Sequence, residues 1–320
     1  MEYSLSLKLS HVTEVAAVAA ARAAGYGDKK MADHDAVEAM RDAFNEVEFD
    51  GKVVIGEGER DKAPMLFIGE KLGTGNGVQV DIAVDPLENT NATATLGPRA
   101  IAVLAASEKG GLFHAPDIYM QKLIVGPESA GKVQLDDPVG KTLKTLAKGL
   151  KRTVKDLIIV SLDRSYNEDS VEAIRKEGAR VKLVPDGDLL PGVAACMRGT
   201  GVHAVIGSGA APEGVMAAAA VKCLKGEMQG RFWSKDGEGK KRLLKMGGDP
   251  DRIYSHNELA SGKTVLFVAT GVTNGDILRG VRFFGGGART HTLVMSTQTK
   301  KVRFIDTTHV FDQELINYKL

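Results

Sequence analysis

Residues 81–91 read Asp-Ile-Ala-Val-Asp-Pro-Leu-Glu-Asn-Thr-Asn. Apolar residues alternate up to Val84, which predicts a buried strand that ends where Pro86 removes a backbone donor. Asp85 and Glu88 then leave the strand together, where the next helix is expected to begin. Two neighbouring carboxylates repel each other unless a divalent cation lies between them, so the segment predicts a metal site that can also bind a phosphate.

The composition is that of a globular protein with a large core. The chain has 320 residues, 43% of them hydrophobic, and its 42 Lys and Arg nearly balance its 41 Asp and Glu. This balance favours a small substrate over nucleic acid. Both cysteines lie in apolar stretches, which argues against a disulfide framework. No apolar run approaches the roughly 20 residues that span a bilayer, and no signal peptide is recognisable. We therefore expect a cytoplasmic protein that binds neither nucleic acid nor membranes.

The first half of the chain combines helices and strands without a repeat. In order, the sequence predicts a helix at 10–24, a helix at 35–46 after a loop that holds Asp33, a strand at 52–55, a helix at 63–72, and strands at 78–85 and 99–107.

The second half alternates strands and helices more regularly. The sequence predicts strands at 157–162, 180–184 and 203–206, helices at 168–177, 189–197 and 212–224, and final strands at 265–269, 291–296 and 302–308. This alternation is typical of an α/β layer with right-handed crossovers. The change in pattern near residue 155 suggests two closely packed lobes, residues 1–155 and 156–320.

Five acids stand at strand ends, glycine-rich turns or helix starts, namely Asp33, Glu57, Asp85, Glu88 and Glu213. Each has an ordinary explanation alone: Glu213, for example, follows a proline in a first helical turn, where an acid is favoured anyway. As a set they suggest a metal site, because α/β sheets place ligands at strand ends. Oxygen-only ligands suit Mg²⁺ or Mn²⁺ rather than Zn²⁺. Two such ions could bind a phosphate and activate a bridging water.

A nucleotide cofactor is not expected. Gly207-Ser208-Gly209 follows a strand and opens a helix, but Pro212 occupies the position of the third glycine in the dinucleotide-binding pattern. No Walker-type phosphate loop occurs either.

With these residues in place, the chain resembles the class II fructose-1,6-bisphosphatases, the bacterial branch of the lithium-sensitive sugar and inositol phosphatase superfamily. The resemblance runs from end to end. It rests on seven ordered motifs, which lie at 27–33, 53–59 (Val-Val-Ile-Gly-Glu-Gly-Glu), 63–70, 81–88 (Asp-Ile-Ala-Val-Asp-Pro-Leu-Glu), 115–127, 184–188 (Val-Pro-Asp-Gly-Asp) and 209–215 (Gly-Ala-Ala-Pro-Glu-Gly-Val).

The resemblance implies an α/β (α+β) fold with α-β-α-β-α layers. It implies hydrolysis of the 1-phosphate of fructose 1,6-bisphosphate to fructose 6-phosphate and phosphate, with sedoheptulose 1,7-bisphosphate as a second substrate. It further implies two or more Mn²⁺ or Mg²⁺ ions per site and a place in carbohydrate metabolism, in gluconeogenesis. We also expect a homo-oligomer, either a dimer or a tetramer.

The resemblance also assigns roles to individual residues. Asp33 and Glu57 would hold one metal ion, while Asp85, Glu88 and Glu213 hold the other. Thr90 would orient or deprotonate the attacking water, with Asp33 or Glu57 taking up the proton. The residues expected to hold the sugar and its phosphates are Glu88, Asn89, Thr90, Tyr119, Arg164, Ser165, Tyr166, Asp186, Gly187, Asp188 and the backbone at Ala210.

Two departures from the family pattern concern the substrate. Asn89 stands where the family usually has glycine, and its side chain either obstructs the phosphate or acts as an adapted ligand. Arg164-Ser165-Tyr166-Asn167 replaces a run that commonly reads Lys/Arg-Pro-Arg-His, so one guanidinium is lost. Two alternative functions stay open: an inositol-type monophosphatase, and a sugar-phosphate-binding regulator that has lost turnover.

Overall fold

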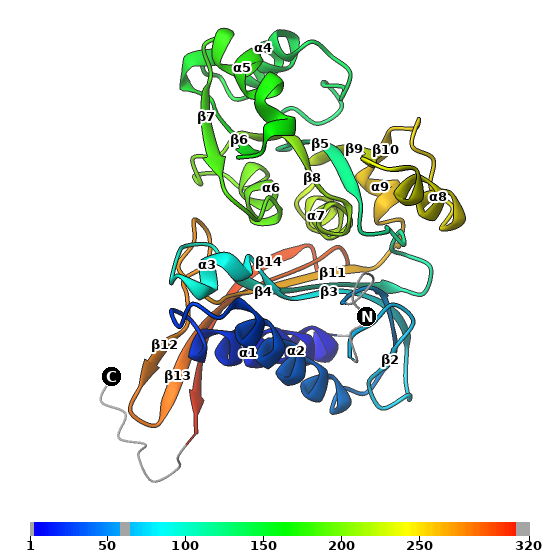
Figure 1. Ribbon diagram of the computed structural model, residues 1–320, viewed down its shortest axis with the longest axis vertical. Coiled ribbons are helices and arrows are strands. Elements are labelled where there is room, and N and C mark those ends of the chain that lie inside the picture. The colour runs from blue at the N-terminus through cyan, green and yellow to red at the C-terminus, as the bar shows by residue number, and fades with distance from the viewer. Residues whose placement is uncertain (1–2, 58–64, 312–320) are drawn as a thin grey trace. The chain divides into compact units, whose positions relative to one another are not determined.

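The computed structural model describes residues 3–57 and 65–311 (Figure 1). The chain divides into two compact units. The first comprises residues 1–58, 63–105 and 266–320. The second comprises residues 106–265 together with 59–62, which lie outside the described residues. These limits differ from the boundary that the sequence suggested near residue 155, because the last strands of the chain return to the sheet that the first strands build.

The first unit is built on an eight-stranded mixed sheet with the strand order β12-β13-β11-β4-β3-β1-β2, in which β14 also pairs with β13. Helices α1 and α2 pack on each other and on this sheet (Figure 1). Strand β1 runs parallel to β3, whereas β13 runs antiparallel to β11, β12 and β14. The elements are α1 (Tyr3–Arg22), α2 (Lys29–Asn45), β1 (Asp50–Ile55), β2 (Lys71–Leu72), β3 (Gln79–Glu88), α3 (Thr90–Ala94), β4 (Ile101–Glu108), β11 (Val265–Gly271), β12 (Arg282–Phe284), β13 (Gly287–Ser296) and β14 (Lys301–Val310).

The second unit is built on a six-stranded mixed sheet with the order β10-β9-β5-β8-β6-β7. Strands β6, β7 and β8 are parallel, and β5 runs antiparallel to β8 and β9. The elements are β5 (Tyr119–Val125), α4 (Val139–Gly149), η1 (Val154–Asp156), β6 (Ile158–Leu162), η2 (Ser165–Asn167), α5 (Glu168–Lys176), β7 (Arg180–Val184), α6 (Leu189–Ala195), β8 (Ala204–Ala210), α7 (Ala211–Leu224), β9 (Glu227–Trp233), α8 (Gly237–Lys245), β10 (Tyr254–Ser255) and α9 (His256–Leu259).

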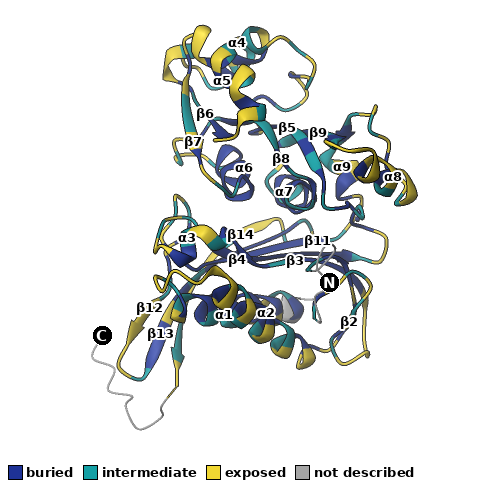
Figure 2. Ribbon diagram, viewed as in Figure 1, coloured by how far each residue is buried: buried dark blue, intermediate teal, exposed yellow. Residues whose placement is uncertain are grey.

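Helices cover both faces of this second sheet (Figure 1). On one face, Leu143 and Leu146 of α4 and Ile174 of α5 join an apolar cluster with Leu123 and Ile159 of the sheet. On the other face lie α6 and α7, and α7 is buried along most of its length while α5 and α8 show exposed outer surfaces (Figure 2). An alanine-rich helix without a polar face is expected to be buried in this way.

The predicted fold class is confirmed. The first unit has a helical layer and a sheet, and the second has a sheet between two helical layers, which agrees with a layered α/β (α+β) fold. One predicted element was wrong. Of the helix predicted at 63–72, residues 63 and 64 lie outside the described residues, and residues 65–72 form bends, a turn and the short strand β2. In the described part of the chain, no helix has the length and hydropathy needed to cross a membrane.

Two boundaries next to the predicted site also differ. Helix α2 begins at Lys29, with Asp28 as its N-cap, so Asp33 lies within the helix and not in a loop before it. Strand β3 continues through Pro86 to Glu88, although the proline was expected to end it. The register of β1 on β3 ends at Ala83, so that ladder needs no donor at the proline.

A buried polar network joins α1 to the last strands of the first unit. The hydroxyl oxygen of Thr13 lies 2.8 Å from that of Thr270, which lies 2.9 Å from that of Thr292. Thr292 and Thr307 both donate to Oε1 of Glu14, at 3.2 and 2.9 Å. Burial raises the pKa of Glu14, and these hydrogen bonds oppose the rise only in part. Burial therefore disfavours the ionised form of this carboxyl group.

We predict that Glu14→Gln increases the free energy of unfolding at pH 8 and that the difference from the parent disappears toward pH 4. Because the pKa of Glu14 is raised by folding, the folded state binds this proton more tightly than the unfolded chain does. Stability therefore falls as the pH rises from the unfolded to the folded pKa. Glutamine keeps an oxygen for the two threonines but does not titrate.

The measurement is thermal unfolding of both proteins from pH 4 to pH 8. The exposed Glu172 of α5 provides the matched control, since Glu172→Gln should leave the pH dependence unchanged. If Glu14→Gln followed the same pH curve as the parent, Glu14 would have the same pKa in the folded and unfolded states.

Candidate active site

Glu57 and Asp85 lie at the carboxyl ends of neighbouring parallel strands. Ile55 of β1 pairs with Ala83 of β3, and each acid lies two residues beyond its member of this pair. The β1–β3 ladder ends at this pair, so both acids lie just beyond it. The backbone N–H of Glu57 donates to the carbonyl of Leu66 at 2.9 Å, which fixes the chain where it leaves β1. The structure thus places two of the predicted ligands just after the same ladder.

Asp33 and Glu88 belong to elements that pack around the same end of β3. Helix α2, which carries Asp33, packs against β3 and α3. Burial raises the pKa of Asp33. Glu88 is the last residue of β3 and is buried. The loop before α2 is tied to α3, because Gly25 and Gly27 donate backbone N–H groups to carbonyls of α3, each at 3.0 Å.

Asn89 has the left-handed backbone that its position predicted, with φ 72° and ψ 55°. It is the N-cap of α3, and its side-chain oxygen accepts a hydrogen bond from the N–H of Ala92 at 3.2 Å. Thr90 is the first residue of α3 and is half-buried. The side chain of Asn89 therefore stabilises the start of α3, whether or not it also binds a phosphate.

The metal-ligand set stays a prediction. Over residues 3–57 and 65–311, no three His, Cys, Asp or Glu side chains are grouped closely enough to form a ready metal site. The chemistry of the set nevertheless suits a hard divalent ion, since every donor is a carboxylate oxygen. Four of the acids belong to the first unit and Glu213 belongs to the second.

In the second unit, the predicted sugar-binding residues gather at one end of the sheet. Tyr119, the first residue of β5, is paired directly with Ala210, the last residue of β8. Asp188 is the N-cap residue of α6 and accepts two hydrogen bonds from Nζ of Lys122, at 2.8 and 2.7 Å. A Cβ atom on Gly209 would collide with the carboxylate of Asp188. The glycine therefore lets the ion pair lie directly beside β8.

Glu213 lies in the first turn of α7, as predicted. Its Oε2 atom is buried and has no hydrogen-bond partner in the part of the chain that the structure describes. Burial raises the pKa of Glu213 to about 7, and the positive charge of Lys122 opposes the rise. A buried carboxylate oxygen of this kind requires a partner, and a bound cation would supply one.

The turn after β7 places Asp186 beside Arg164, with Nη2 of the arginine 3.7 Å from Oδ1 of the aspartate. Gly187 has a φ of 73°, and its N–H donates to Oδ1 of Asp186 at 3.1 Å. Ser165 and Tyr166 begin the short helix η2 directly after Arg164. These five residues therefore follow the carboxyl ends of β6 and β7, where an α/β sheet binds its ligands.

Three aromatic rings form a cluster next to these residues. Tyr119 stacks on Trp233 with ring centroids 4.5 Å apart, and Tyr166 meets both rings nearly edge-on, at 5.3 and 5.6 Å. Nε1 of Trp233 donates to the hydroxyl of Ser208 at 3.2 Å. Nζ of Lys235 lies 5.1 Å from the centroid of Tyr119 and 5.5 Å from that of Tyr166. We call these three rings the aromatic cluster.

The sequence analysis missed Lys122, Trp233 and Lys235. A lysine beside the apolar run Leu123 to Val125 was a usable signal, because a lysine in a central strand must be paired when it is buried. Trp233 is the only tryptophan of the chain, but nothing in the sequence places it against Tyr119.

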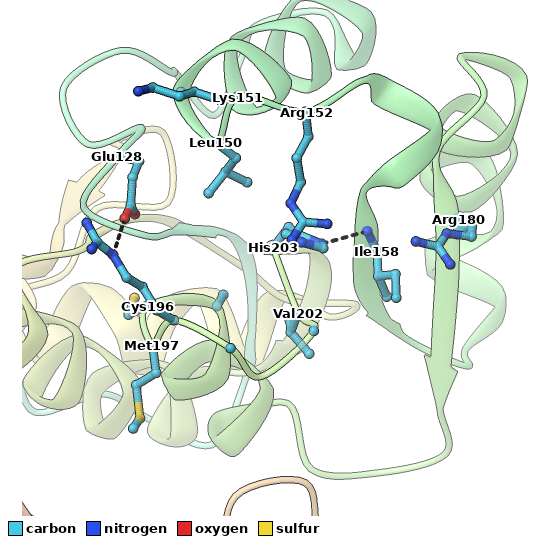
Figure 3. A pocket seen from close by; sticks show the side chains of 15 residues that line it. Glu128, Leu150, Lys151, Arg152, Ile158, Arg180, Cys196, Met197, Val202 and His203 are labelled. Atoms are coloured by element: carbon cyan, nitrogen blue, oxygen red, sulfur yellow. Dashed lines mark hydrogen bonds and ion pairs between the residues drawn. The ribbon is translucent and has the colours of Figure 1, made fainter.

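A cavity of about 540 Å³ lies at the opposite end of the same sheet (Figure 3). It is lined at the starts of the parallel strands, where Ile158 donates its N–H to Nδ1 of His203 at 2.9 Å. None of the predicted site residues lines it. Arg152 and Arg198 follow the C-terminal ends of α4 and α6, where positive charge is favoured, and Arg198 pairs with Glu128 at 2.9 Å. These two arginines in the cavity lining are thus explained by their positions at helix ends and by the ion pair with Glu128.

Comparison with known proteins agrees with the resemblance that the motifs indicated. The model of a family described as bacterial fructose-1,6-bisphosphatase, glpX-encoded, matches residues 3–309. A D-fructose 1,6-bisphosphatase class 2/sedoheptulose 1,7-bisphosphatase of Synechococcus sp. (strain JA-3-3Ab) is 50% identical over 337 residues, which cover 98% of this chain and 97% of that protein.

Two further relatives carry the same name. The protein of Thermosynechococcus vestitus is 46% identical over 346 residues, covering 100% of both chains, and that of Synechococcus elongatus (strain ATCC 33912 / PCC 7942 / FACHB-805) is 48% identical over 337 residues, covering 98% of both. The similarity spans both units, and with them every residue of the predicted site. The chain therefore belongs to the bacterial fructose-1,6-bisphosphatase family.

Proposed function

We propose that this protein hydrolyses the 1-phosphate of fructose 1,6-bisphosphate to fructose 6-phosphate and phosphate, and that it also accepts sedoheptulose 1,7-bisphosphate. The observation that carries the proposal is an identity of 46–50% over nearly the whole chain to relatives whose names state both activities. A phosphatase of this family is a hydrolase, and this chain has five acids and Thr90 within the motifs that resemble the family.

The proposed metal ligands are Asp33, Glu57, Asp85, Glu88 and Glu213, with two or more Mn²⁺ or Mg²⁺ ions. Three features support them: the donors are all carboxylates, Glu57 and Asp85 both directly follow the β1–β3 ladder, and Oε2 of Glu213 is a buried acceptor in need of a partner. When bound, such ions would polarise the phosphate and lower the pKa of a water molecule.

The remaining chemistry falls to side chains. The hydroxyl of Thr90 orients the attacking water, and Asp33 or Glu57 accepts the proton that the water loses. The oxygen of this water ends on phosphorus, the bond from phosphorus to the sugar oxygen breaks, and that oxygen takes up a proton. Tyr119, Asp188 and the backbone at Ala210 bind the sugar. Arg164, together with Asp186, lies where the second phosphate of the substrate would bind.

The cellular setting is part of the proposal. We place the enzyme in the cytoplasm, in carbohydrate metabolism and specifically in gluconeogenesis, as a homo-oligomer without nucleic-acid partners. The near balance of charge supports a small-molecule substrate. Light scattering coupled to gel filtration measures whether the protein is a dimer or a tetramer.

The deciding experiment is phosphate release from a panel of substrates, with Mg²⁺ and with Mn²⁺. The panel contains fructose 1,6-bisphosphate, sedoheptulose 1,7-bisphosphate, fructose 1-phosphate, fructose 6-phosphate and inositol 1-phosphate. Preference for a bisphosphate supports the proposal. Preference for inositol 1-phosphate would favour the monophosphatase, and tight binding without release would favour a regulator.

We predict that exhaustive chelation abolishes phosphate release and that Mn²⁺ or Mg²⁺ restores it, whereas Ca²⁺ restores it poorly. A site for in-line displacement needs small, rigidly coordinated ions.

Glu57→Gln should reduce turnover far more than it lowers the melting temperature, because removing one acid relieves repulsion in the metal-free protein. Full activity after chelation would end the metal proposal, and equal losses of folding and turnover would make Glu57 structural.

We predict that Thr90→Ser keeps measurable activity, since the hydroxyl survives, whereas Thr90→Val loses about 10²-fold or more in kcat, the usual scale for a positioned proton-transfer group. Steady-state kinetics on fructose 1,6-bisphosphate measure this, and metal binding by calorimetry should change little in either variant. A valine variant as active as the parent would remove Thr90 from the chemistry.

For Asn89 we predict that replacement by glycine raises KM for fructose 1,6-bisphosphate by about tenfold, because the side-chain amide is lost as a charge-assisted donor. The cap on α3 is lost too, and for a glycine replacement that costs only a few tenths of a kcal/mol. Melting temperatures separate the two effects. A higher kcat together with a lower KM would show instead that Asn89 obstructs the phosphate.

A further inference from the structure

We propose that Lys235 binds the phosphate that the enzyme does not hydrolyse and so contributes to the preference for a bisphosphate. The inference rests on the proposed function and adds a residue that neither the motifs nor the comparisons assign. Its basis is the placement of one cation on the aromatic cluster, among the residues expected to hold the sugar.

Lys235 follows β9 at the end of the sheet where the sugar-binding residues gather. Trp233, the last residue of β9, pairs with Tyr119 across the β5–β9 ladder, and Tyr119 pairs with Ala210 on its other side. The ammonium group of Lys235 lies 5.1 and 5.5 Å from the ring centroids of Tyr119 and Tyr166. These distances are within the range of cation–π attraction, so the rings hold a long, exposed side chain in one place.

The charge of Lys235 stays available to a ligand. Neutral rings position an ammonium group without cancelling its charge, whereas a carboxylate would cancel it. In the described part of the chain, Lys235 forms no ion pair with a carboxylate. The adjacent Asp236 caps α8 instead, accepting the N–H of Gly239 at 2.7 Å.

Within the described residues, two other cations near the predicted sugar site, Lys122 and Arg164, are already paired. Lys122 is 1% exposed and bonded to Asp188, and Arg164 lies 3.7 Å from Asp186. A phosphomonoester brings close to two negative charges, and one partly compensated guanidinium matches them poorly. Lys235 supplies the missing positive charge.

Tyr166 links the aromatic cluster to these charged residues. Its pKa is raised, mainly by burial, and the charges of Arg164, Asp188 and Asp186 all act on it. The charge of Arg164 thus acts on the ring that Lys235 contacts. This chain has Tyr166 within the segment where the resemblance leads one to expect a further basic residue. The ring holds Lys235 in place. This lysine, which follows β9, therefore compensates for the basic residue that is absent from the segment after β6.

The first test uses binding without turnover. Trp233 is the only tryptophan of the protein and stacks on Tyr119, so its fluorescence reports on ligands at this place. Fructose 6-phosphate carries only the phosphate that is retained, and fructose 1-phosphate carries only the one that is cleaved. Lys235→Met should weaken binding of fructose 6-phosphate about tenfold and leave fructose 1-phosphate unaffected, and Lys235→Arg should restore binding.

Kinetics supply the second test. Lys235→Met should raise KM for fructose 1,6-bisphosphate about tenfold, with kcat and the hydrolysis of fructose 1-phosphate changed less than twofold. The matched control is Lys240→Met, which removes an exposed lysine from α8 and should change neither constant.

The outcomes are distinct. Equal affinity of parent and Lys235→Met for fructose 6-phosphate would overturn the proposal, and so would an equal loss for both monophosphates, which would indicate a structural effect. If the parent hydrolysed no sugar bisphosphate, the proposed function would fail, while the Trp233 titration would still decide whether Lys235 binds a sugar phosphate.

Discussion

The ion pair between Lys122 and Asp188 is the interaction on which the second unit's candidate site depends. A lysine with 1% of its surface exposed is tolerated in a central strand only because both carboxylate oxygens of Asp188 accept from it. The pair fixes the start of α6, requires glycine at 209, and places a positive charge where it acts on Glu213. Removing one partner of such a pair typically costs about 3–5 kcal/mol, so the site and the stability of the unit are coupled.

The candidate residues of the two units differ in kind. The candidate residues of the first unit include four acids, which would repel a phosphate in the absence of cations. Those of the second unit include Lys122 and Arg164, and Lys235 stands beside them. The proposed metal ions would compensate the acids of the first unit, whereas in the second unit Lys122 and Arg164 are paired with Asp188 and Asp186, which leaves Lys235 for the proposed phosphate contact.

Sequence patterns predicted most of the regular elements, because alternation and helical spacing report directly on burial. The patterns did not predict the structure correctly where contacts between distant parts of the chain determine it. Pro86 lies inside β3 beyond the last residue that pairs with β1, and residues 65–72 lead into β2, which pairs with β1, instead of forming a helix. The site acids could be named from the sequence, but the Lys122–Asp188 pair could not, since its partners lie 66 residues apart and meet only across the sheet.

Asn89 and Tyr166, the two departures from the family pattern, have different physical explanations. At Asn89 the backbone demand is unchanged: φ of 72° suits glycine, and asparagine is among the few other residues that tolerate it. The substitution therefore keeps the turn and adds a helix cap. At Tyr166 the chemistry itself changes, because a planar neutral ring replaces a possible cation and gains its energy by packing on Tyr119 and Trp233. A ring cannot bind a phosphate by charge, but it can fix a cation that does, so the packing determines which neighbouring lysine becomes part of the site.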